Sequence, residues 1–306
     1  MKGRILEMLR GEGDVVSGEA LSRRLGVSRV SIWKHLQKLQ EMGYGIESSP
    51  RGYRLLEAPD RLYPWEFPGW EARIHHYPEV ESTMEVARRM ARQGCPAFTV
   101  VAADRQTAGR GRLQRAWVSE AGGIYLTVVL RPLLPPQLGY RVNFAVSAVL
   151  ARVLRRRYDV DARVKWPNDI LLDGRKVCGL LAEMEAEADL VRFVNVGLGI
   201  NANNDPPATE TGAVSLRRVL GRTVSRRNLT ADFLAALEAR LAGGDLADAV
   251  AEWRRYAITL DRRVRVVTTR ETIEGRAVDV DDSGALIVEQ ADGTRREVIY
   301  GDCFLK

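Results

Sequence analysis

The chain has 306 residues, of which 45% are hydrophobic and 28% are charged, and its formal net charge is +6. These values are ordinary for a globular protein, and the length allows two or three domains. No apolar run approaches the ~20 residues of a membrane-spanning helix, so we expect no membrane segment. Three cysteines without a CxxC pair and three histidines without a cluster argue against a zinc site and suit the reducing cytoplasm, where we expect the protein.

Residues 1–56 carry ten basic and six acidic side chains, which is four of the six net positive charges. The apolar spacing in this segment predicts three helices, with Ser17 and Ser28 capping the second and third. Gly26 separates these two helices, and the small residues around it have the spacing of a helix-turn-helix, in which two helices pass closely. The segment is therefore a candidate DNA-binding domain.

The third of these helices leaves one polar face available, and the Ser-Ser-Pro-Arg-Gly turn after it predicts a β-hairpin. Together they indicate a winged helix-turn-helix, whose third helix enters the major groove while the wing touches the DNA backbone. A small helical protein-interaction domain remains an alternative, because similar spacing also occurs outside DNA-binding proteins. The expected DNA contacts are Arg29, Ser31, Lys34 and Arg51.

Residues 57–68 contain three prolines and little periodicity, so we expect a linker. Residues 69–258 then mix strand and helix patterns, and the turn pair Asp173-Gly174 between two apolar runs predicts a hairpin. We therefore expect a central α/β domain built on a mixed or largely antiparallel sheet. The expected strands include 98–103 and 124–130, and the expected helices are 82–92, 139–157, 230–241 and 246–256.

From residue 259 the pattern changes to four short β-branched strands separated by glycine turns. This predicts a small C-terminal β-barrel over residues 259–306 and completes a multidomain α+β chain. Its eight basic and ten acidic side chains give a net charge of −2, so this domain is a poor candidate for binding nucleic acid.

The most informative stretch is Gln106-Thr-Ala-Gly-Arg-Gly-Arg112, which follows a predicted buried strand. Glycine lets backbone N–H groups approach a bound anion, and arginine adds paired donors that match carboxylate or phosphate oxygens. Taken alone, the stretch is equally compatible with a solvated basic turn. A second run, Lys165-Trp-Pro-Asn-Asp169, precedes the hairpin that places Lys176 near the start of its second strand. Two separate segments therefore offer fixed cations.

These two runs, with Ser82-Thr83 before them and Gly199-Ile200-Asn201 after them, closely resemble the catalytic domain of biotin protein ligases. Several motifs in a fixed order are far more specific than any one of them. The N-terminal segment likewise resembles the winged helix-turn-helix of those ligases that also repress the biotin operon. The resemblance implies a cytoplasmic enzyme that activates biotin with ATP to biotinyl-AMP and transfers it to a lysine of the biotin carboxyl carrier protein, an acetyl-CoA carboxylase subunit. It also implies a homodimer, favoured by biotinyl-AMP, that represses biotin genes at operator DNA.

The family also implies roles for individual residues. Arg112 and Lys176 are the expected catalytic cations that neutralise two anionic reactants, and Asp169 is an orienting or proton-accepting partner. Mg²⁺ is expected to accompany ATP, and no protein side chain is expected as its ligand. The biotin site is expected to comprise Ser82, Thr83, Gln106, Arg110, Gly111, Arg112, Lys176 and Gly179. The adenylate site is expected to comprise Arg110, Arg112, Trp117, Asn168 and Asn201.

Simpler interpretations exist for three of these residues. Ser82 is also placed to cap a helix, with capping-box spacing to Glu85, while Gln106 suits a solvated loop and Asn201 a turn. One residue departs from the family pattern, because Met84 stands where the family usually has Asn, and methionine cannot replace an amide hydrogen bond. Two other functions also stay open: a regulator that binds biotinyl-AMP without transferring it, and a lipoate or octanoate ligase.

Overall fold

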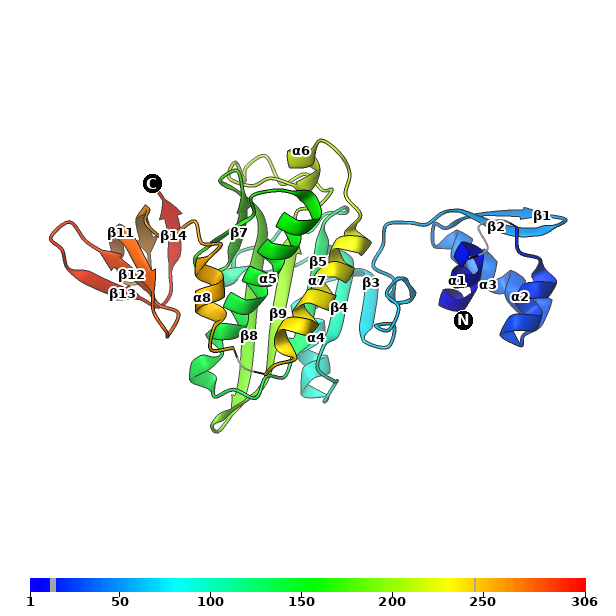
Figure 1. Cartoon of the computed structure of the whole chain (residues 1–306), viewed down its shortest axis with the longest axis horizontal. Helices are drawn as coiled ribbons and strands as arrows, with labels where there is room; N and C mark the ends of the chain where they lie inside the picture. Colours follow the sequence, from blue (N-terminus) through cyan, green and yellow to red (C-terminus); the bar gives the residue numbers. More distant parts are fainter. Residues whose placement is uncertain (12–14, 245) are drawn as a thin grey trace. The chain divides into compact units, whose positions relative to one another are not determined.

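The computed structural model describes residues 1–11, 15–244 and 246–306. The chain divides into two compact units, residues 1–71 and residues 72–306, and each is described by itself (Figure 1). Within the described ranges, no helix combines the length and the apolar character that a membrane crossing requires.

The first unit is a winged helix-turn-helix. It consists of α1 (Lys2–Gly11), α2 (Gly18–Leu25) and α3 (Arg29–Glu41), followed by the antiparallel hairpin β1 (Gly45–Ser49) and β2 (Gly52–Glu57). The hydroxyls of Ser17 and Ser28 accept hydrogen bonds from backbone N–H groups at 3.0 and 3.2 Å, which confirms both predicted caps. Gly26 has φ +66°, a left-handed conformation that glycine adopts without a steric cost, and α2 therefore ends where the sequence predicts.

The proline-rich segment after the wing is packed onto this first unit. It contains a short 3₁₀ helix, η1 (Pro64–Glu66), and the side chain of Glu66 is almost fully buried. Nη2 of Arg10 lies 2.8 Å from both carboxylate oxygens of Glu66, and the hydroxyl of Tyr44 donates to the same carboxylate at 2.5 Å. The segment 57–68, which the sequence predicts as a linker, therefore makes contacts within the first compact unit, and the boundary between the compact units falls after Glu71.

The second unit is built on a seven-stranded mixed sheet in the order β3-β4-β5-β9-β8-β7-β6. Only β3 and β4 pair in parallel, and all other neighbours are antiparallel. The strands are β3 (Ile74–Val80), β4 (Thr99–Gln106), β5 (Ile124–Leu130), β6 (Arg163–Lys165), β7 (Asp169–Leu172), β8 (Arg175–Glu187) and β9 (Leu190–Ile200). The predicted hairpin at Asp173-Gly174 joins β7 to β8, so its prediction is confirmed.

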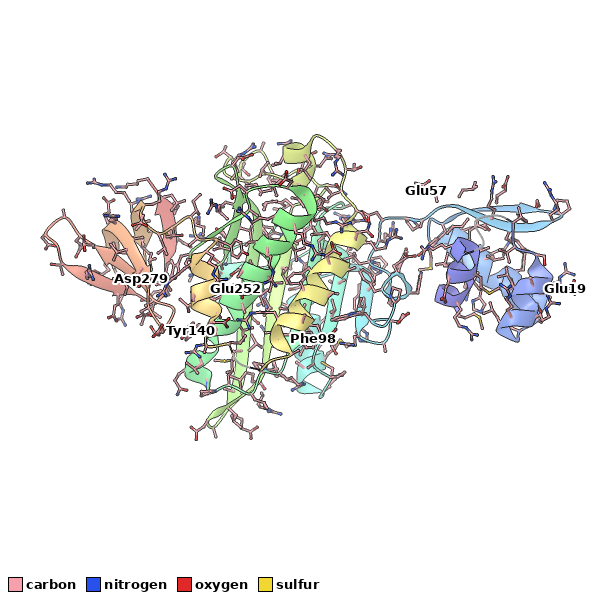
Figure 2. All side chains as sticks on the ribbon, in the orientation of Figure 1. Glu19, Glu57, Phe98, Tyr140, Glu252 and Asp279 are labelled. Atoms are coloured by element: carbon pink, nitrogen blue, oxygen red, sulfur yellow. The ribbon has the colours of Figure 1, made fainter. Side chains whose placement is uncertain are left out.

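Helices α5 (Tyr140–Tyr158), α7 (Arg226–Leu241) and α8 (Ala249–Arg254) lie together over one face of this sheet (Figure 1). The rings of Phe144 on α5 and Trp253 on α8 meet edge to face at 5.1 Å. Figure 2 labels Tyr140 at the start of α5 and Glu252 on α8. Helix α4 (Thr83–Arg92) packs on β4, β5 and β9. A short helix, α6 (Leu216–Leu220), follows β9.

Three helix predictions need correction. α4 begins where expected, but the Ser82 side chain makes no capping hydrogen bond, and Glu85 pairs with arginines instead of closing a capping box. α7 starts at Arg226, four residues earlier than expected, because Ser225 caps it. α8 is shorter at both ends than the predicted 246–256.

The C-terminal segment forms a five-stranded antiparallel sheet in the order β13-β12-β11-β10-β14. Its strands are β10 (Arg263–Val267), β11 (Thr272–Val280), β12 (Leu286–Glu289), β13 (Arg295–Val298) and β14 (Asp302–Leu305). The last strand is additional to the four predicted. The buried indole N–H of Trp166 donates to the carbonyl of Gly284 at 3.1 Å and so joins this sheet to the central domain.

Candidate active site and nucleic-acid interface

A cavity of about 490 Å³ lies in the second unit, between the loop that contains GRGR, the strands β8 and β9, and β14. Segments far apart in the sequence meet here because β8 and β9 are central neighbours in the sheet while the loop after β4 covers them. All twelve residues expected for the biotin, adenylate and catalytic functions line this cavity. They are Ser82, Thr83, Gln106, Arg110, Gly111, Arg112, Trp117, Asn168, Asp169, Lys176, Gly179 and Asn201.

The inner wall depends on glycines in the two central strands. A Cβ atom at Gly199 would lie 2.4 Å from the indole of Trp117, and a Cβ atom at Gly179 would lie 3.0 Å from the same ring. The missing side chains therefore create the seat in which Trp117 rests against the sheet. Its indole Nε1 is buried and has no hydrogen-bond partner among the described residues, so it is a free donor beside the cavity.

A chain of polar groups crosses the end of the cavity nearest to α4. The side-chain oxygen of Gln106 accepts from the backbone N–H of Thr83 at 2.8 Å and lies 3.1 Å from the Thr83 hydroxyl. The Gln106 amide donates to Ser119 at 2.8 Å, and Thr127 donates to Thr83 at 2.9 Å. Gln106 is therefore fixed by partners on both sides, which argues against the solvated-loop interpretation. The hydroxyl of Ser82 is buried beside them without a partner in the described chain.

Two lysines share one carboxylate at the opposite side of the cavity. Nζ of Lys176 lies 2.8 Å from Oδ1 of Asp169, and Nζ of Lys165 lies 3.4 Å from Oδ2. Lys176 also sits 5.2 Å from the centre of the Trp117 ring, at cation–π distance. Because both lysines belong to short, hydrogen-bonded strand ends, their charges are held at the cavity wall.

Arg112 is half-buried and contacts neutral oxygens. Its guanidinium donates to Oδ1 of Asn168 at 3.2 Å and to the carbonyl of Gly301 at 3.1 Å. Burial lowers the pKa of the Arg112 guanidinium below its ordinary value, although Asp302 and Asp169 act in the opposite direction. Arginine nevertheless stays charged in proteins, so a bound anion here would compensate a desolvated cation.

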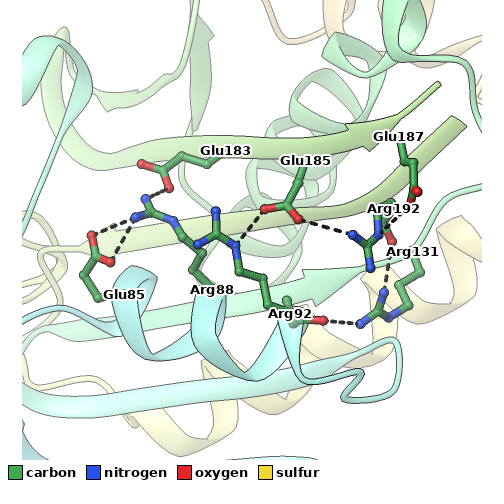
Figure 3. A network of polar contacts seen from close by, with 9 residues as sticks. Glu85, Arg88, Arg92, Arg131, Glu183, Glu185, Glu187 and Arg192 are labelled. Atoms are coloured by element: carbon green, nitrogen blue, oxygen red, sulfur yellow. Dashed lines mark hydrogen bonds and ion pairs between the residues drawn. The ribbon is translucent and has the colours of Figure 1, made fainter. Parts of the chain in front are cut away.

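Arg110 is placed differently from Arg112. Nη2 of Arg110 lies 2.5 Å from Glu85 on α4 and 3.5 Å from Glu183 on β8. Both carboxylates also contact Arg88, and the alternation of arginine and glutamate continues along α4 and the β8–β9 hairpin (Figure 3). The side chain of Arg110 is therefore already neutralised by protein carboxylates, whereas Arg112 makes no direct contact with a carboxylate of the described residues.

Asn201 occupies the turn at the end of β9 and is held on several sides. Its Oδ1 accepts from Asn204 at 3.0 Å, and its backbone N–H donates to Val177 at 2.8 Å. Asp302 and Phe304 of β14 also line the cavity, and the sequence analysis missed them. They were missed because β14 is short and was not predicted.

The first unit presents the expected DNA-contacting residues on its surface. Arg29, Lys34 and Arg51 are exposed, whereas Ser31 is half-buried, and its backbone N–H is the one that Ser28 caps. Trp33 of the same helix is 47% exposed and adds an apolar side chain to this surface. It was not among the residues predicted from the sequence. The helical spacing could have revealed it, because Ile32, directly before Trp33, points inward.

Three family models match the chain in order: an HTH domain over residues 3–54, the biotin/lipoate A/B protein ligase family over 77–201, and the biotin protein ligase C-terminal domain over 259–306. The chain is 32% identical to the bifunctional ligase/repressor BirA of Bacillus subtilis (strain 168), covering 95% of each chain. It is 34% identical to the biotin–[acetyl-CoA-carboxylase] ligase of Paracoccus denitrificans, covering 72% of this chain and 98% of that one.

Among solved structures, the biotin protein ligase of Aquifex aeolicus in complex with biotin and ATP matches with a TM-score of 0.65 at 25% identity. That match covers 76% of this chain and 98% of the Aquifex chain. The chain belongs to the biotin protein ligase family. The match to the Bacillus subtilis ligase/repressor covers 95% of the chain, which is more than the ligase domains alone occupy, and the HTH domain model matches residues 3–54.

Proposed function

We propose that this chain is a biotin–protein ligase and a biotin-responsive repressor. The observation that carries the ligase half is the convergence of all twelve expected residues on one cavity in a member of this family. The proposed substrates are biotin, ATP and the biotin carboxyl carrier protein of acetyl-CoA carboxylase. The proposed functional segments are 1–56 for DNA, 57–68 as the connection, 69–258 for catalysis and 259–306 as the C-terminal sheet domain.

In the first step, a carboxylate oxygen of biotin attacks the α-phosphorus of ATP. A new P–O bond forms, the bond to the β-phosphate oxygen breaks, and biotinyl-AMP and pyrophosphate result. Both reactants are anions, so fixed cations must offset their repulsion and the charge on the transferring group. Arg112 and Lys176 are proposed for this part because each lines the cavity. An anion bound at Arg112 would compensate a partly desolvated guanidinium, whereas an anion bound at Lys176 would share this ammonium group with Asp169 or displace that carboxylate.

Mg²⁺ is proposed to arrive with the nucleotide. Among the described residues no group of three histidine, cysteine or carboxylate side chains could hold a metal ion, so the phosphates would supply most of its ligands. When bound, the ion would neutralise phosphate charge.

Biotin is proposed to bind with its ureido ring at the Ser82, Thr83 and Gln106 end. This end offers donors and acceptors that a ring carrying both N–H groups and a carbonyl needs. Gly111 and Gly179 leave room for the biotin chain, and the adenylate would lie against Trp117 with Asn168 and Asn201 nearby. Arg110 is proposed to contribute mainly through its backbone, because Glu85 and Glu183 already hold its guanidinium.

In the second step, the neutral ε-amine of the carrier lysine attacks the acyl carbon of biotinyl-AMP. A C–N bond forms, the C–O bond to the phosphate breaks, and AMP leaves while the amine loses a proton. The ammonium group of a free lysine has a pKa of ~10.4, so it must first lose a proton. Asp169 is proposed to orient the amine or accept that proton, because its carboxylate lies at the cavity wall between two ammonium groups.

The repressor half rests on the first unit and on the ligase/repressor relative. Arg29, Ser31, Lys34 and Arg51 are proposed to contact operator DNA through α3 and the wing, in a homodimer that biotinyl-AMP favours. One winged unit covers little surface, so two half-sites are expected. The proposed use of ATP and the three free cysteines are consistent with a location in the cytoplasm.

Two assays test the two halves separately. Mass spectrometry of a carrier domain incubated with the protein, biotin, ATP and Mg²⁺ should show one added biotin, and no transfer to carrier domains from several species would reject the ligase. Footprinting on the protein's own biotin-gene promoter should show protection that biotin plus ATP strengthens. Lys34→Ala should weaken that protection and Arg175→Ala, an equal charge change at the exposed first residue of β8 in the second unit, should not. Equal DNA protection by both variants would show that α3 is not the helix that contacts the operator.

A further inference from the structure

Two large apolar side chains lie exposed on α3, the helix proposed to enter the DNA groove. Val30 is 63% exposed and Trp33 is 47% exposed. The buried residues Ile32, Leu36 and Leu39 define the inner face of the helix, and Val30 and Trp33, three residues apart, lie together outside it. Exposing two such side chains to water gains nothing for the first unit itself, so the pair is placed to contact a partner.

The polar residues of α3 show where this pair lies on the helix. Lys34 and Gln37 are exposed, and with the apolar pair they lie within about 100° of one another around the helix axis. Ser31 is half-buried at one edge of this outer face. Arg29 lies at the other edge and leans toward α2, because a Cβ atom at Gly18 would lie 3.9 Å from its Nε. The apolar pair therefore belongs to the centre of the outer face.

The charges around the pair favour DNA as the partner. α3 carries three cations, Arg29, Lys34 and Lys38, and one carboxylate, Glu41. The whole segment 1–56 has four more basic than acidic side chains. A cationic helix suits the phosphates on both sides of a major groove, and its central residues then meet the edges of the bases.

The chemistry of the base edges decides what an apolar side chain can recognise there. In the major groove, the C5-methyl group of thymine is apolar, whereas the other distinguishing groups are hydrogen-bond donors and acceptors. Contacts between cations and phosphates hold the protein on DNA but carry no sequence information. Apolar side chains at the centre of the outer face would therefore distinguish thymine from the other bases.

We propose that Val30 and Trp33 determine operator specificity by packing against thymine methyl groups in each half-site. This rests on the proposed repressor function and adds which bases the helix recognises. The cations of α3 supply affinity for the phosphates, and the apolar pair supplies sequence preference. Each contact removes both the side chain and the methyl group from water, which is the source of its stabilisation.

The test removes single methyl groups from the operator. The full chain with biotin, ATP and Mg²⁺ is footprinted on the promoter of its own biotin genes, and each thymine of the protected region is then replaced, one at a time, by uracil. Uracil pairs as thymine does but lacks the methyl group. Dissociation constants are measured at one fixed salt concentration, because phosphate contacts make affinity depend on salt.

The variants are Val30→Ala and Trp33→Ala. The matched control is Ile299→Ala, which removes an aliphatic β-branched side chain that is 75% exposed on the second unit. For the wild type, we expect uracil to weaken binding about fourfold at each contacted thymine, with at least one such position in every half-site. Val30→Ala should abolish this penalty at some positions and Trp33→Ala at others. Ile299→Ala should bind as the wild type does and keep every penalty.

Two results would overturn the proposal. One is wild-type binding that is equal for thymine and uracil at all positions. The other is a full uracil penalty in both variants; if these variants also bound every fragment more weakly by one common factor, the two side chains would contact a second protein copy instead of the bases. A wild-type protein that protects no promoter DNA would reject the repressor function itself, and the proposal with it.

Discussion

Gly199→Ala should test the seat of Trp117 most directly. The added Cβ would lie 2.4 Å from the indole, whereas ordinary contacts begin near 3.4 Å, so the ring must move by about 1 Å. Overpacking of this size costs about 1–3 kcal/mol. Trp117 is half-buried on a loop, so we expect its ring to move outward. The free-energy cost of the substitution should then weaken ligand binding and leave the free energy of unfolding nearly unchanged.

Affinity for biotin and for ATP, measured by titration calorimetry, should therefore fall about 5- to 150-fold in Gly199→Ala, since 1.4 kcal/mol is a factor of ten. Gly179→Ala should have a smaller effect, because its Cβ would meet the same ring at 3.0 Å and the flexible end of Lys176 at 3.2 Å. The control is Gly243→Ala, where a Cβ meets nothing within 4 Å.

The melting temperature shows whether the free-energy cost of Gly199→Ala falls on ligand binding or on folding. It should be close to wild type in Gly199→Ala if Trp117 swings out. Wild-type affinity in Gly199→Ala would refute the reasoning, because the indole would then not depend on the glycine seat. A large fall in melting temperature with unchanged affinity would refute it equally.

Three further predictions concern single side chains. Arg112→Gly and Lys176→Ala should each slow ATP–pyrophosphate exchange by about 3 kcal/mol of activation free energy, and near-wild-type exchange in both would reject the proposed clamp. Asn195→Val should raise the free energy of unfolding by about 1–3 kcal/mol in denaturant titrations, because both amide atoms of Asn195 are buried without a partner among the described residues. A loss of stability would show that the amide is paired in solution. Burial raises the pKa of Cys303 to about 11, so this thiol stays protonated below that pH and should resist alkylation at pH 8. Rapid labelling of Cys303 in the native protein would contradict this prediction.

The sequence predicted most of the fold because its local signals are strong. Serine caps, the left-handed Gly26 and the Asp-Gly turn each specify the backbone over a few residues, and the structure has them where expected. The last strand was missed for the opposite reason. β14 is only four residues long, and its pairing with β10 depends on a long-range contact that no local pattern encodes.

Long-range packing acts on two segments that local patterns describe. Residues 57–68 remain a predicted linker, and the structure adds that their buried Glu66 is held by Arg10 and Tyr44, which lie more than 20 residues away. The capping-box prediction after Ser82 is wrong, because Glu85 pairs with Arg88 and Arg110 instead of a backbone N–H. The pair with Arg110 is invisible in a local pattern, since Arg110 comes from the loop after β4.

The candidate site was predicted as a set of residues but not as a balance of charges. The sequence places three cations beside the cavity, and the simplest expectation is that all of them bind the anionic substrates. In the part of the chain that the structure describes, the three differ: Arg110 is held by two glutamates, Lys176 by one aspartate, and Arg112 by neutral oxygens. The free energy gained on binding an anion is greatest where no carboxylate must be displaced. Arg112 should therefore contribute most to substrate affinity, and Lys176 should contribute after exchanging Asp169 for the substrate. Asp169 would then keep its contact with Lys165 and have one carboxylate oxygen available for the incoming amine.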